Sequence, residues 1–254
     1  MYQEDIGNVS AAAQVKLALL RKGKFKYIVA SALAGIYVGF GILLIYSIGG
    51  LLSQGPSPAA RIVMGVSFGI ALSLVIMAGA ELLTGNNMIM SVANLERKIS
   101  VSSAVSIYAY NFAGNLIGSF LLAALFYGGG LLQGSTGAFI VKTAQTKMTL
   151  PWLELLARGI LCNMLVCLAI WCSFRMKEEA GKLIMVFWCL FAFITTGFEH
   201  SVANMTLLSA ALFAPGAASV SVAGFIYNIV IVTIGNFLGA LVIGGSYWYI
   251  SKED

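Results

Sequence analysis

Long runs without a charged residue dominate the chain. Residues 27–52 and 99–141 contain no Lys, Arg, Asp or Glu, and residues 183–250 contain only Glu199 and His200 as acidic or basic side chains. One crossing of a bilayer by an α-helix takes about 20 apolar residues. The pattern therefore predicts an all-α membrane protein.

Six segments are long and apolar enough to cross a membrane. The second and the fifth are interrupted by polar residues, near 81–87 and 198–204. The polar connection 129–151 separates the first three segments from the last three, which predicts two repeats of about 27–131 and 152–250. The predicted segments are Tyr27–Leu52, Arg61–Leu95, Val101–Leu131, Trp152–Phe174, Leu183–Leu212 and Ala223–Ile250.

The two halves share a pattern of polar residues. Residues 81–86 and 199–204 each begin with Glu and end with Asn, and a Gly-Asn-x-x-Gly motif at 114–118 recurs at 235–239. Because each half has an odd number of spans, the second copy must enter the membrane from the opposite side. Inverted repeats with interrupted helices at corresponding positions are typical of a transport site near the middle of the membrane.

The interruptions free backbone N–H and C=O groups that hydrocarbon cannot satisfy. We expect Glu81 and Glu199 to act as a scaffold that accepts the N–H groups of their own loops. Asn86, Asn87 and Asn204 are expected to bond other freed groups. The half-helices that follow are predicted to begin near Asn87 and Asn204, with their positive ends toward the middle of the membrane, where they attract anions.

His200 differs from the rest of the repeated pattern because Leu82 occupies its place in the first half. A scaffold role would not require this asymmetry. Imidazole titrates near neutral pH, so it can donate a proton or carry a switchable charge. We therefore predict a functional role for His200.

Composition and charge agree with a membrane protein. Charged residues make up 10% of the chain, whereas soluble proteins carry about 25%. The net charge of +5 comes from Lys and Arg between the spans, so no nucleic-acid partner is implied. Most of these residues lie on the side of both termini, which predicts cytoplasmic termini in a multi-pass plasma-membrane protein in contact with lipid.

We expect residues 1–26 to form a separate arm and to contain no cleavable signal peptide. The amphipathic stretch 11–20, with Val15, Ala18 and Leu19 near one face, is predicted to lie on the cytoplasmic membrane surface. The four cysteines lack the spacing of metal ligands, so no metal site is expected. An enzyme is not expected either, since the chain has one His and no nucleophile placed with a base.

Two motifs resemble the formate/nitrite transporter family. They are Gly79-Ala-Glu-Leu-Leu-Thr-Gly-Asn86 and Gly197-Phe-Glu-His-Ser-Val-Ala-Asn204, supported by the run Tyr110-Asn-Phe-Ala-Gly-Asn115. The resemblance covers nearly the whole chain and is closest to the hydrosulfide channel branch, near the nitrite channels. It implies an aquaporin-like homopentamer without a cofactor, in which each protomer conducts small monovalent anions through its own pore.

The same resemblance assigns roles to individual residues. Phe68, Leu72 and Phe193 match a cytoplasmic constriction, and Leu82 and Leu83 match an outer one. The remaining assignments place Thr84 and His200 in the chamber between the constrictions, and Lys147 and Asn163 where they draw the anion toward the outer constriction. Lys16 matches no residue of known role and is expected to add positive potential at the inner mouth.

These expectations define a mechanism and its alternatives. Apolar constrictions penalise a bare anion, so a hydrosulfide ion would cross most easily when it is transiently neutral, with His200 and Thr84 assisting. The first alternatives are a formate or nitrite channel and a proton-coupled anion transporter. A channel for neutral solutes, of the aquaporin type, is a further alternative.

Overall fold

The computed structural model describes residues 2–55, 57–214, 216 and 220–252, and over these residues the chain is helical without a β-strand. Six helical segments are long and apolar enough to span a membrane, which confirms the predicted fold class. They are α2 (Lys24–Leu52), the run of α3 (Ala60–Ser67), α4 (Ile70–Leu74) and η1 (Val75–Gly79), α6 (Val101–Gly128), α8 (Trp152–Arg175), α9 (Glu179–Thr196) and α11 (Val222–Ser251).

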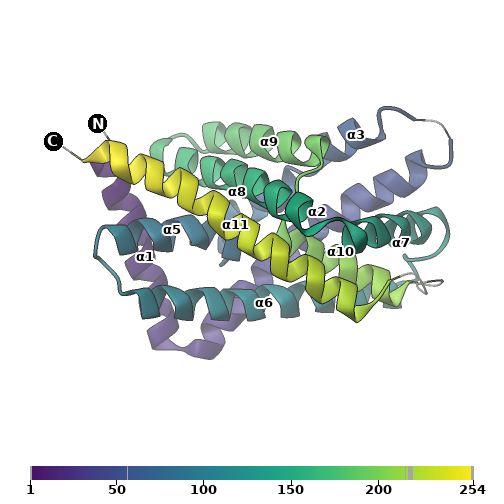
Figure 1. Ribbon diagram of the computed structural model, residues 1–254, viewed down its shortest axis with the longest axis horizontal. Coiled ribbons are helices and arrows are strands. Elements are labelled where there is room, and N and C mark those ends of the chain that lie inside the picture. The colour runs from purple at the N-terminus through teal and green to yellow at the C-terminus, as the bar shows by residue number, and fades with distance from the viewer. Residues whose placement is uncertain (1, 56, 215, 217–219, 253–254) are drawn as a thin grey trace.

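Two short helices continue the interrupted segments and form the centre of the bundle (Figure 1). They are α5 (Leu83–Leu95) and α10 (Ser201–Phe213). All residues from 83 to 93 and from 201 to 211 are buried. Because both half-helices are enclosed by longer spans, the polar groups at their N-termini are held inside protein and away from lipid.

Both termini lie at one end of the bundle, as an even number of crossings requires (Figure 1). We call this end the terminal end and the opposite one the distal end. Since α2 leads away from α1, the run from α3 to η1 enters at the distal end and α9 enters at the terminal end. The two interrupted segments therefore approach the centre from opposite sides.

Glycines let the spans approach closely, as the repeated Gly-Asn-x-x-Gly motif predicts. A side chain at Gly118 would collide with the carbonyl oxygen of Ala32 on α2, and one at Gly239 would collide with that of Ile160 on α8. The α2–α6 and α8–α11 pairs thus pack backbone against backbone in the same way.

The breaks lie slightly earlier in the sequence than predicted. Break one is residues 80–82 and break two is residues 197–200. Gly79 and Gly197 bend the chain, with φ of +79° and +81°, in a region that glycine adopts without steric cost. Gly85, the other glycine of the motif at residues 79–86, lies inside α5.

The half-helices also begin earlier than predicted. They start at Leu83 and Ser201 and not near Asn87 and Asn204, which lie within the first two turns. The earlier start is possible because partners from other helices receive the first N–H group of each half-helix. Such partners cannot be recognised from the local sequence.

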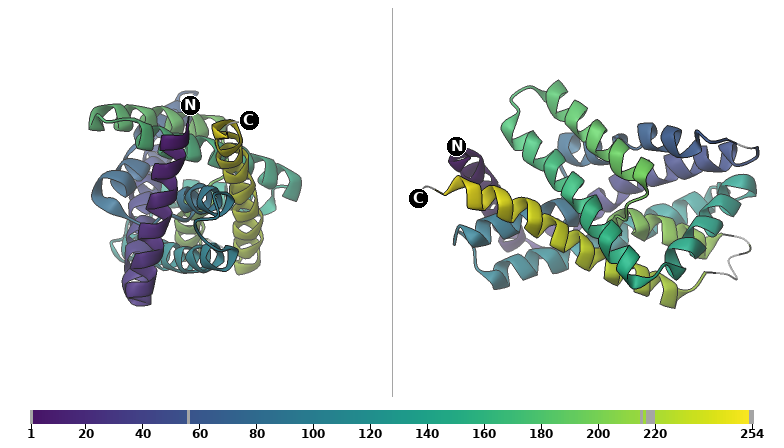
Figure 2. Two further views of the ribbon diagram at one scale, coloured as in Figure 1. Left: turned by 90° about the vertical axis from the view of Figure 1, so that its left-hand side faces the viewer. Right: turned by 45° about the horizontal axis from the view of Figure 1, so that its top comes forward.

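The N-terminal arm packs on protein, and its predicted position on the membrane surface stays a prediction. Helix α1 (Gln3–Lys22) lies across the terminal end (Figure 2, left) and packs mainly on α5. Val15, which we placed on the apolar face, is 70% exposed. The face that is buried contains Ile6, Val9, Ala13, Leu17 and Leu20.

The connection between the halves contains a helix that we did not predict. Helix α7 (Gly134–Thr149) packs on α2, α10 and α11 at the distal end. Its buried residues are spaced by three or four positions, as on one face of a helix: Gly137, Ile140, Ala144 and Met148. Lys147 is thereby placed next to break two.

Candidate functional site

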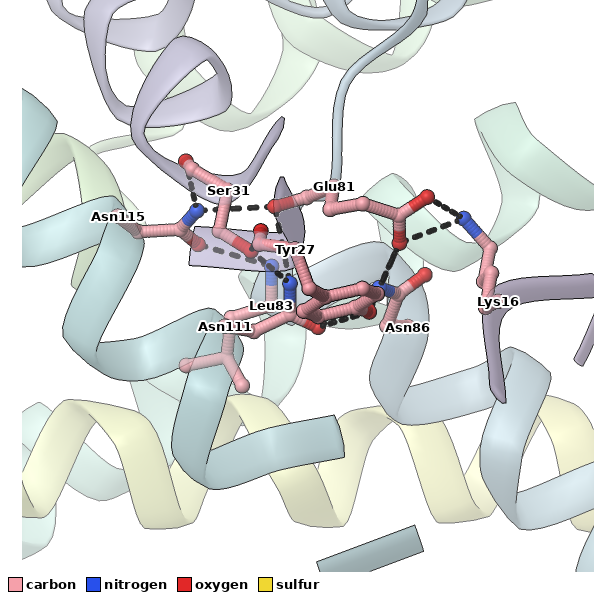
Figure 3. Close-up of polar contacts among 8 residues, drawn as sticks. All are labelled: Lys16, Tyr27, Ser31, Glu81, Leu83, Asn86, Asn111 and Asn115. Carbon is pink, nitrogen blue, oxygen red and sulfur yellow. Dashed lines mark hydrogen bonds and ion pairs between the residues drawn. The ribbon is translucent and has the colours of Figure 1, made fainter. Parts of the chain in front are cut away.

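Three side chains converge on the Glu81 carboxylate in break one (Figure 3). Lys16 Nζ lies 2.9 Å from both carboxylate oxygens. The Tyr27 hydroxyl and Asn86 Nδ2 donate to Oε2 at 3.0 and 2.8 Å. Asn86 also donates to Asn111 Oδ1 on α6, at 2.7 Å. The lysine from α1 therefore neutralises the glutamate, and two amides connect the pair to α6.

Break two contains the same arrangement. Lys147 Nζ lies 2.6 Å from Glu199 Oε1, and Asn204 Nδ2 donates to Glu199 Oε2 at 2.6 Å and to Asn228 Oδ1 at 2.8 Å. This pair is more deeply buried, since the Glu199 side chain is 2% exposed and the Glu81 side chain is 12% exposed. Helices α1 and α7 thus supply equivalent lysines.

One asparagine side chain holds the backbone of each break. Asn115 Oδ1 accepts the N–H of Leu83 at 2.9 Å, while its Nδ2 donates to the carbonyls of Ser31 at 2.7 Å and Glu81 at 2.9 Å. Asn236 makes the same three contacts in break two. Its partners are the N–H of Ser201 at 2.9 Å and the carbonyls of Gly159 at 2.8 Å and Glu199 at 2.9 Å.

The prediction that Glu81 and Glu199 accept the N–H groups of their loops was therefore wrong. A carboxylate inside a membrane requires a cation more than it requires neutral donors. An amide suits the loops better because it accepts from an N–H and donates to a C=O at the same place. The backbone N–H groups of the two glutamates donate to the carbonyls of Ala30 at 3.1 Å and Arg158 at 3.2 Å.

Sequence reasoning missed the four asparagines on α6 and α11 as loop partners. Their polarity inside apolar spans was the available signal, since a buried amide must find hydrogen bonds. All four are fully buried: Asn111, Asn115, Asn228 and Asn236. Asn87, which was predicted to hold a loop, contributes its backbone carbonyl, which accepts from the Tyr108 hydroxyl at 3.4 Å.

Thr84 and His200 join the two breaks. His200 Nε2 lies 2.9 Å from Thr84 Oγ1, and His200 Nδ1 accepts the N–H of Ala203 at 3.1 Å. Since a backbone N–H can only donate, Nδ1 carries no hydrogen, and the neutral imidazole keeps its hydrogen on Nε2. That hydrogen is donated to Thr84, and the threonine hydroxyl can donate its own hydrogen to another acceptor.

The same geometry disfavours a charged His200. A proton on Nδ1 would face the N–H of Ala203 and would sit at the positive end of α10. The imidazole therefore acts as an N-cap for α10 and as a neutral hydrogen-bond donor. This geometry favours a hydrogen bond from a neutral His200 over a donated proton or a switchable charge.

Asn163 is buried between the breaks. Its Nδ2 donates to the carbonyls of Thr84 at 3.2 Å and Asn236 at 2.6 Å. Both amide hydrogens of Asn163 are engaged in these bonds. Asn163 therefore has no free N–H with which to attract an anion, the role that was expected of it.

Apolar side chains surround a small cavity next to His200. Phe68 and Phe193 meet edge to face with their ring centroids 5.4 Å apart, and Phe193 stacks on His200 at 6.0 Å. The cavity volume is about 10 Å³, which is close to the space of one water molecule. Its lining is apolar except for the imidazole and consists of Val38, Phe68, Ala71, Leu72, Leu82, Val166, Leu190, Phe193 and His200.

The order of the constrictions relative to the termini is the reverse of the expected one. Phe68 precedes break one in the segment that enters at the distal end, and Phe193 lies in the last turn of α9, just before break two. Leu82 also lines a cavity beneath α1, at the terminal end. Leu72 lies between Phe68 and Leu82 in the sequence and lines the small cavity, and Leu83 lines neither cavity.

The cavity beneath α1 has a volume of about 510 Å³, and we call it the α1 vestibule. The Lys16–Glu81 pair lies on its wall, and Leu82 separates it from the small cavity. Lys182 on α9 also lines it. No three His, Cys, Asp or Glu side chains gather as a metal site would require in the part of the chain that the structure describes.

Comparison with known proteins places this architecture among membrane transporters. The family model described as formate/nitrite transporter matches residues 3–250. The Nitrite transporter NirC of Escherichia coli (strain K12) is 41% identical over 255 residues, which cover 100% of this chain and 94% of that protein. A solved structure described as an FNT family ion channel is 39% identical, with a TM-score of 0.92 and coverage of 98% of this chain and 99% of that one.

A second solved structure is described as a pentameric formate channel with formate bound. It is 26% identical, with a TM-score of 0.81, and the match covers 91% of this chain and 98% of that chain. The six spans, the two breaks and these similarities over nearly the full length of the chain agree. This multi-pass membrane protein belongs to the formate/nitrite transporter family.

Proposed function

We propose that the protein is a channel that conducts a small monovalent anion of a weak acid through a pore in each protomer of a homopentamer, with hydrosulfide (HS⁻) as the substrate. The observation that carries the proposal is the small apolar cavity between the phenylalanine pair and Leu82, in which His200 is the only polar side chain of the lining. The pentameric state is supported by the similarity to a pentameric formate channel.

The single heavy atom of hydrosulfide supports it as the substrate, since it requires the least widening of the small cavity. A volume of about 10 Å³ accommodates one water-sized species. Hydrosulfide has a single heavy atom, whereas nitrite and formate have three each. The larger anions would require Leu72 and Leu82 or the two phenylalanines to move apart during passage.

The apolar lining favours a species that is neutral while it passes. Moving an ion into such surroundings costs far more than moving its conjugate acid, so protonation lowers the barrier. Hydrosulfide has a weak, neutral conjugate acid, H₂S, which would form in the α1 vestibule when the anion takes a proton from a hydronium ion and leaves water. The His200 imidazole lines the cavity, whereas the Thr84 hydroxyl to which it donates lies behind it and would have to turn toward the cavity to donate a hydrogen bond to the anion.

Nitrite is the second candidate, because the relative that is 41% identical is named a nitrite transporter. Formate is supported in the same way by the formate channel structure. The experiment that separates the three is flux into proteoliposomes of hydrosulfide, nitrite, formate and chloride at equal concentration and at several pH values. We expect hydrosulfide to be fastest and chloride, which has no weak conjugate acid, to be slowest.

A wider cavity provides the matched control. Leu72→Ala removes apolar volume from the lining without touching the breaks. We expect it to raise nitrite and formate flux relative to hydrosulfide. If wild-type protein conducts nitrite or formate faster than hydrosulfide, the substrate assignment is wrong. If chloride passes as fast as the weak-acid anions, the mechanism is wrong as well.

Proton-coupled transport is tested by the same preparation. An imposed membrane potential without a pH gradient would shift the hydrosulfide distribution in a channel that carries the charge of the anion, and would not do so in an electroneutral transporter that moves one proton with each anion. The proposed cytoplasmic location of both termini is tested by labelling a cysteine at either end of the chain in intact cells and in inverted membrane vesicles.

A further inference from the structure

The lysines expected to attract anions are both neutralised. Lys16 is paired with Glu81 and Lys147 with Glu199, in side chains that are at most 18% exposed. A paired lysine presents a dipole to an approaching anion, and the field of a dipole decays faster with distance than that of a single charge. The long-range attraction into the pore therefore has to come from another residue.

Lys182 carries an uncompensated positive charge in the α1 vestibule. Only three of the residues that line this cavity are charged, and two of them, Lys16 and Glu81, are paired with each other. Among the described residues no carboxylate oxygen lies within 4.0 Å of Lys182 Nζ. The ion pairs of the described residues are Lys16–Glu81, Lys147–Glu199, Arg158–Glu154, Arg175–Asp5 and Lys252–Glu96.

The other charged residues near the α1 vestibule do not neutralise the positive charge of Lys182. Arg175 on α8 is paired with Asp5 on α1 at 3.2 Å. Glu178 and Glu179 precede Lys182 at the start of α9, but both are exposed and neither lines the vestibule, whereas Lys182 is half-buried and does. The cavity wall thus carries a net charge of about +1 within walls that are largely apolar, where the field is screened less than in open water.

We infer that Lys182 is the residue that captures the anion in the α1 vestibule, and that the Lys16–Glu81 pair fixes the geometry of break one. This inference rests on the proposed function and extends it to a residue that the sequence did not single out. An anion held near Lys182 has Leu82 between it and the small cavity beside His200. The charge raises the local anion concentration before desolvation begins.

The test compares Lys182→Gln with Lys177→Gln in proteoliposomes at substrate concentrations far below saturation. Lys177 belongs to the same connection but is exposed and does not line the vestibule. We expect Lys182→Gln to lower anion flux about three- to tenfold at about 0.01 M salt and much less at about 0.15 M, where the screening length falls from about 30 to about 8 Å. Lys177→Gln should change flux less than twofold.

Chemical restoration of the charge removes any ambiguity about folding. In a Lys182→Cys variant, modification by a cationic methanethiosulfonate should restore flux and an anionic methanethiosulfonate should lower it further, while wild-type protein serves as the control for the native cysteines. Equal flux in wild type and Lys182→Gln at low salt would overturn the inference, as would equal effects of the two reagents. A wild-type protein that conducts no anion would instead overturn the proposed function.

Discussion

The two breaks share a polar frame and differ in the residue that ends the loop. Each has a lysine from a helix outside the six spans, a glutamate, and an asparagine that connects the glutamate to a neighbouring span. Break one ends with Leu82, which separates the two cavities, and break two ends with His200, which reaches Thr84 across the protein centre. The shared frame holds the backbone, and the difference places one polar side chain, His200, in the lining of the small cavity.

A second difference concerns how each glutamate is compensated. Glu81 receives a hydrogen bond from the Tyr27 hydroxyl in addition to its lysine and asparagine. Ser31 and Gly159 make equivalent contacts, and the residue four positions before each is Tyr27 in α2 and Leu155 in α8, which cannot donate. Glu199 is more deeply buried than Glu81, so its lysine carries more of the stabilisation.

The largest expected effect separates the two lysines. Lys147→Met leaves Glu199 as an unpaired charge inside the protein, and breaking such a buried pair costs about 3–5 kcal/mol. Lys16→Met should cost less, because Glu81 keeps its tyrosine and is more exposed. The measurement is the thermal unfolding of the purified protein in detergent.

The control for the lysine prediction is the double variant Lys147→Met/Glu199→Gln. Removal of both charges should recover most of the lost stability, because neither partner is left unpaired. Equal destabilisation by Lys16→Met and Lys147→Met would show that the two pairs are energetically equivalent, contrary to the burial difference.

The next prediction concerns the amides that hold the loops. Asn115→Ala and Asn236→Ala each remove three hydrogen bonds and leave a buried N–H without a partner. The expected loss is about 2–4 kcal/mol for each variant. Because the contacts correspond one to one, the two losses should agree within about 1 kcal/mol. A much larger loss for one of them would show that the breaks are not equivalent as scaffolds.

A smaller effect distinguishes the two roles of His200. Asparagine retains an acceptor that caps α10 but cannot reach Thr84 as imidazole does. We expect His200→Asn to fold with nearly wild-type stability and to conduct hydrosulfide about tenfold more slowly, which corresponds to about 1.4 kcal/mol in the barrier.

The pH profile of the same variant provides the decisive readout. If His200 stays neutral, the wild-type and His200→Asn profiles should have the same shape between pH 5 and 8, because only the substrate titrates. A step that is present in the wild-type profile and absent in the variant would show that His200 takes up a proton during transport.

The smallest expected effect tests the extra hydrogen bond in break one. Tyr27→Phe removes the donor to Glu81 and should cost about 1 kcal/mol, since Lys16 and Asn86 remain. The reciprocal change, Leu155→Tyr, places an aromatic ring in a fully buried site and should destabilise by overpacking. Unfolding in detergent measures both, and a stabilising Tyr27→Phe would contradict the assigned contact.

The fold could be predicted because its signal is local. A span is recognised from about 20 consecutive residues, and a break from a short run of Gly, Asn and Thr within it. Helices α1 and α7 were more difficult, since their apolar faces turn toward other helices. Lys16 on α1 and Lys147 on α7 are equivalent. Repeats that begin with α1 and α7 would therefore describe the symmetry better than the predicted repeats of residues 27–131 and 152–250.

Much of the site is formed by contacts between residues that are far apart in the sequence, and these contacts could not be predicted from it. Glu81, Glu199 and His200 were recognisable as ionisable residues in apolar segments. Their partners were not, because Lys16 and Glu81 are 65 positions apart and Thr84 and His200 are 116 apart. The wrong prediction that the glutamates accept the N–H groups of their loops has the same cause. In a sequence, a carboxylate and an amide near a loop are equally plausible acceptors for its N–H groups.

The sequence alone determined that the chain is a six-span membrane protein with two matched breaks and a single histidine at one of them. Hydrophobic spacing and motif repetition decide those features because both act along the chain. Only the tertiary structure decided which cations are neutralised, which amides hold the loops and in what order the constrictions lie between the termini and the distal end. Those features depend on how helices from both halves pack around the breaks. The effect of a charged or hydrogen-bonding side chain is set by the partner that this packing places beside it.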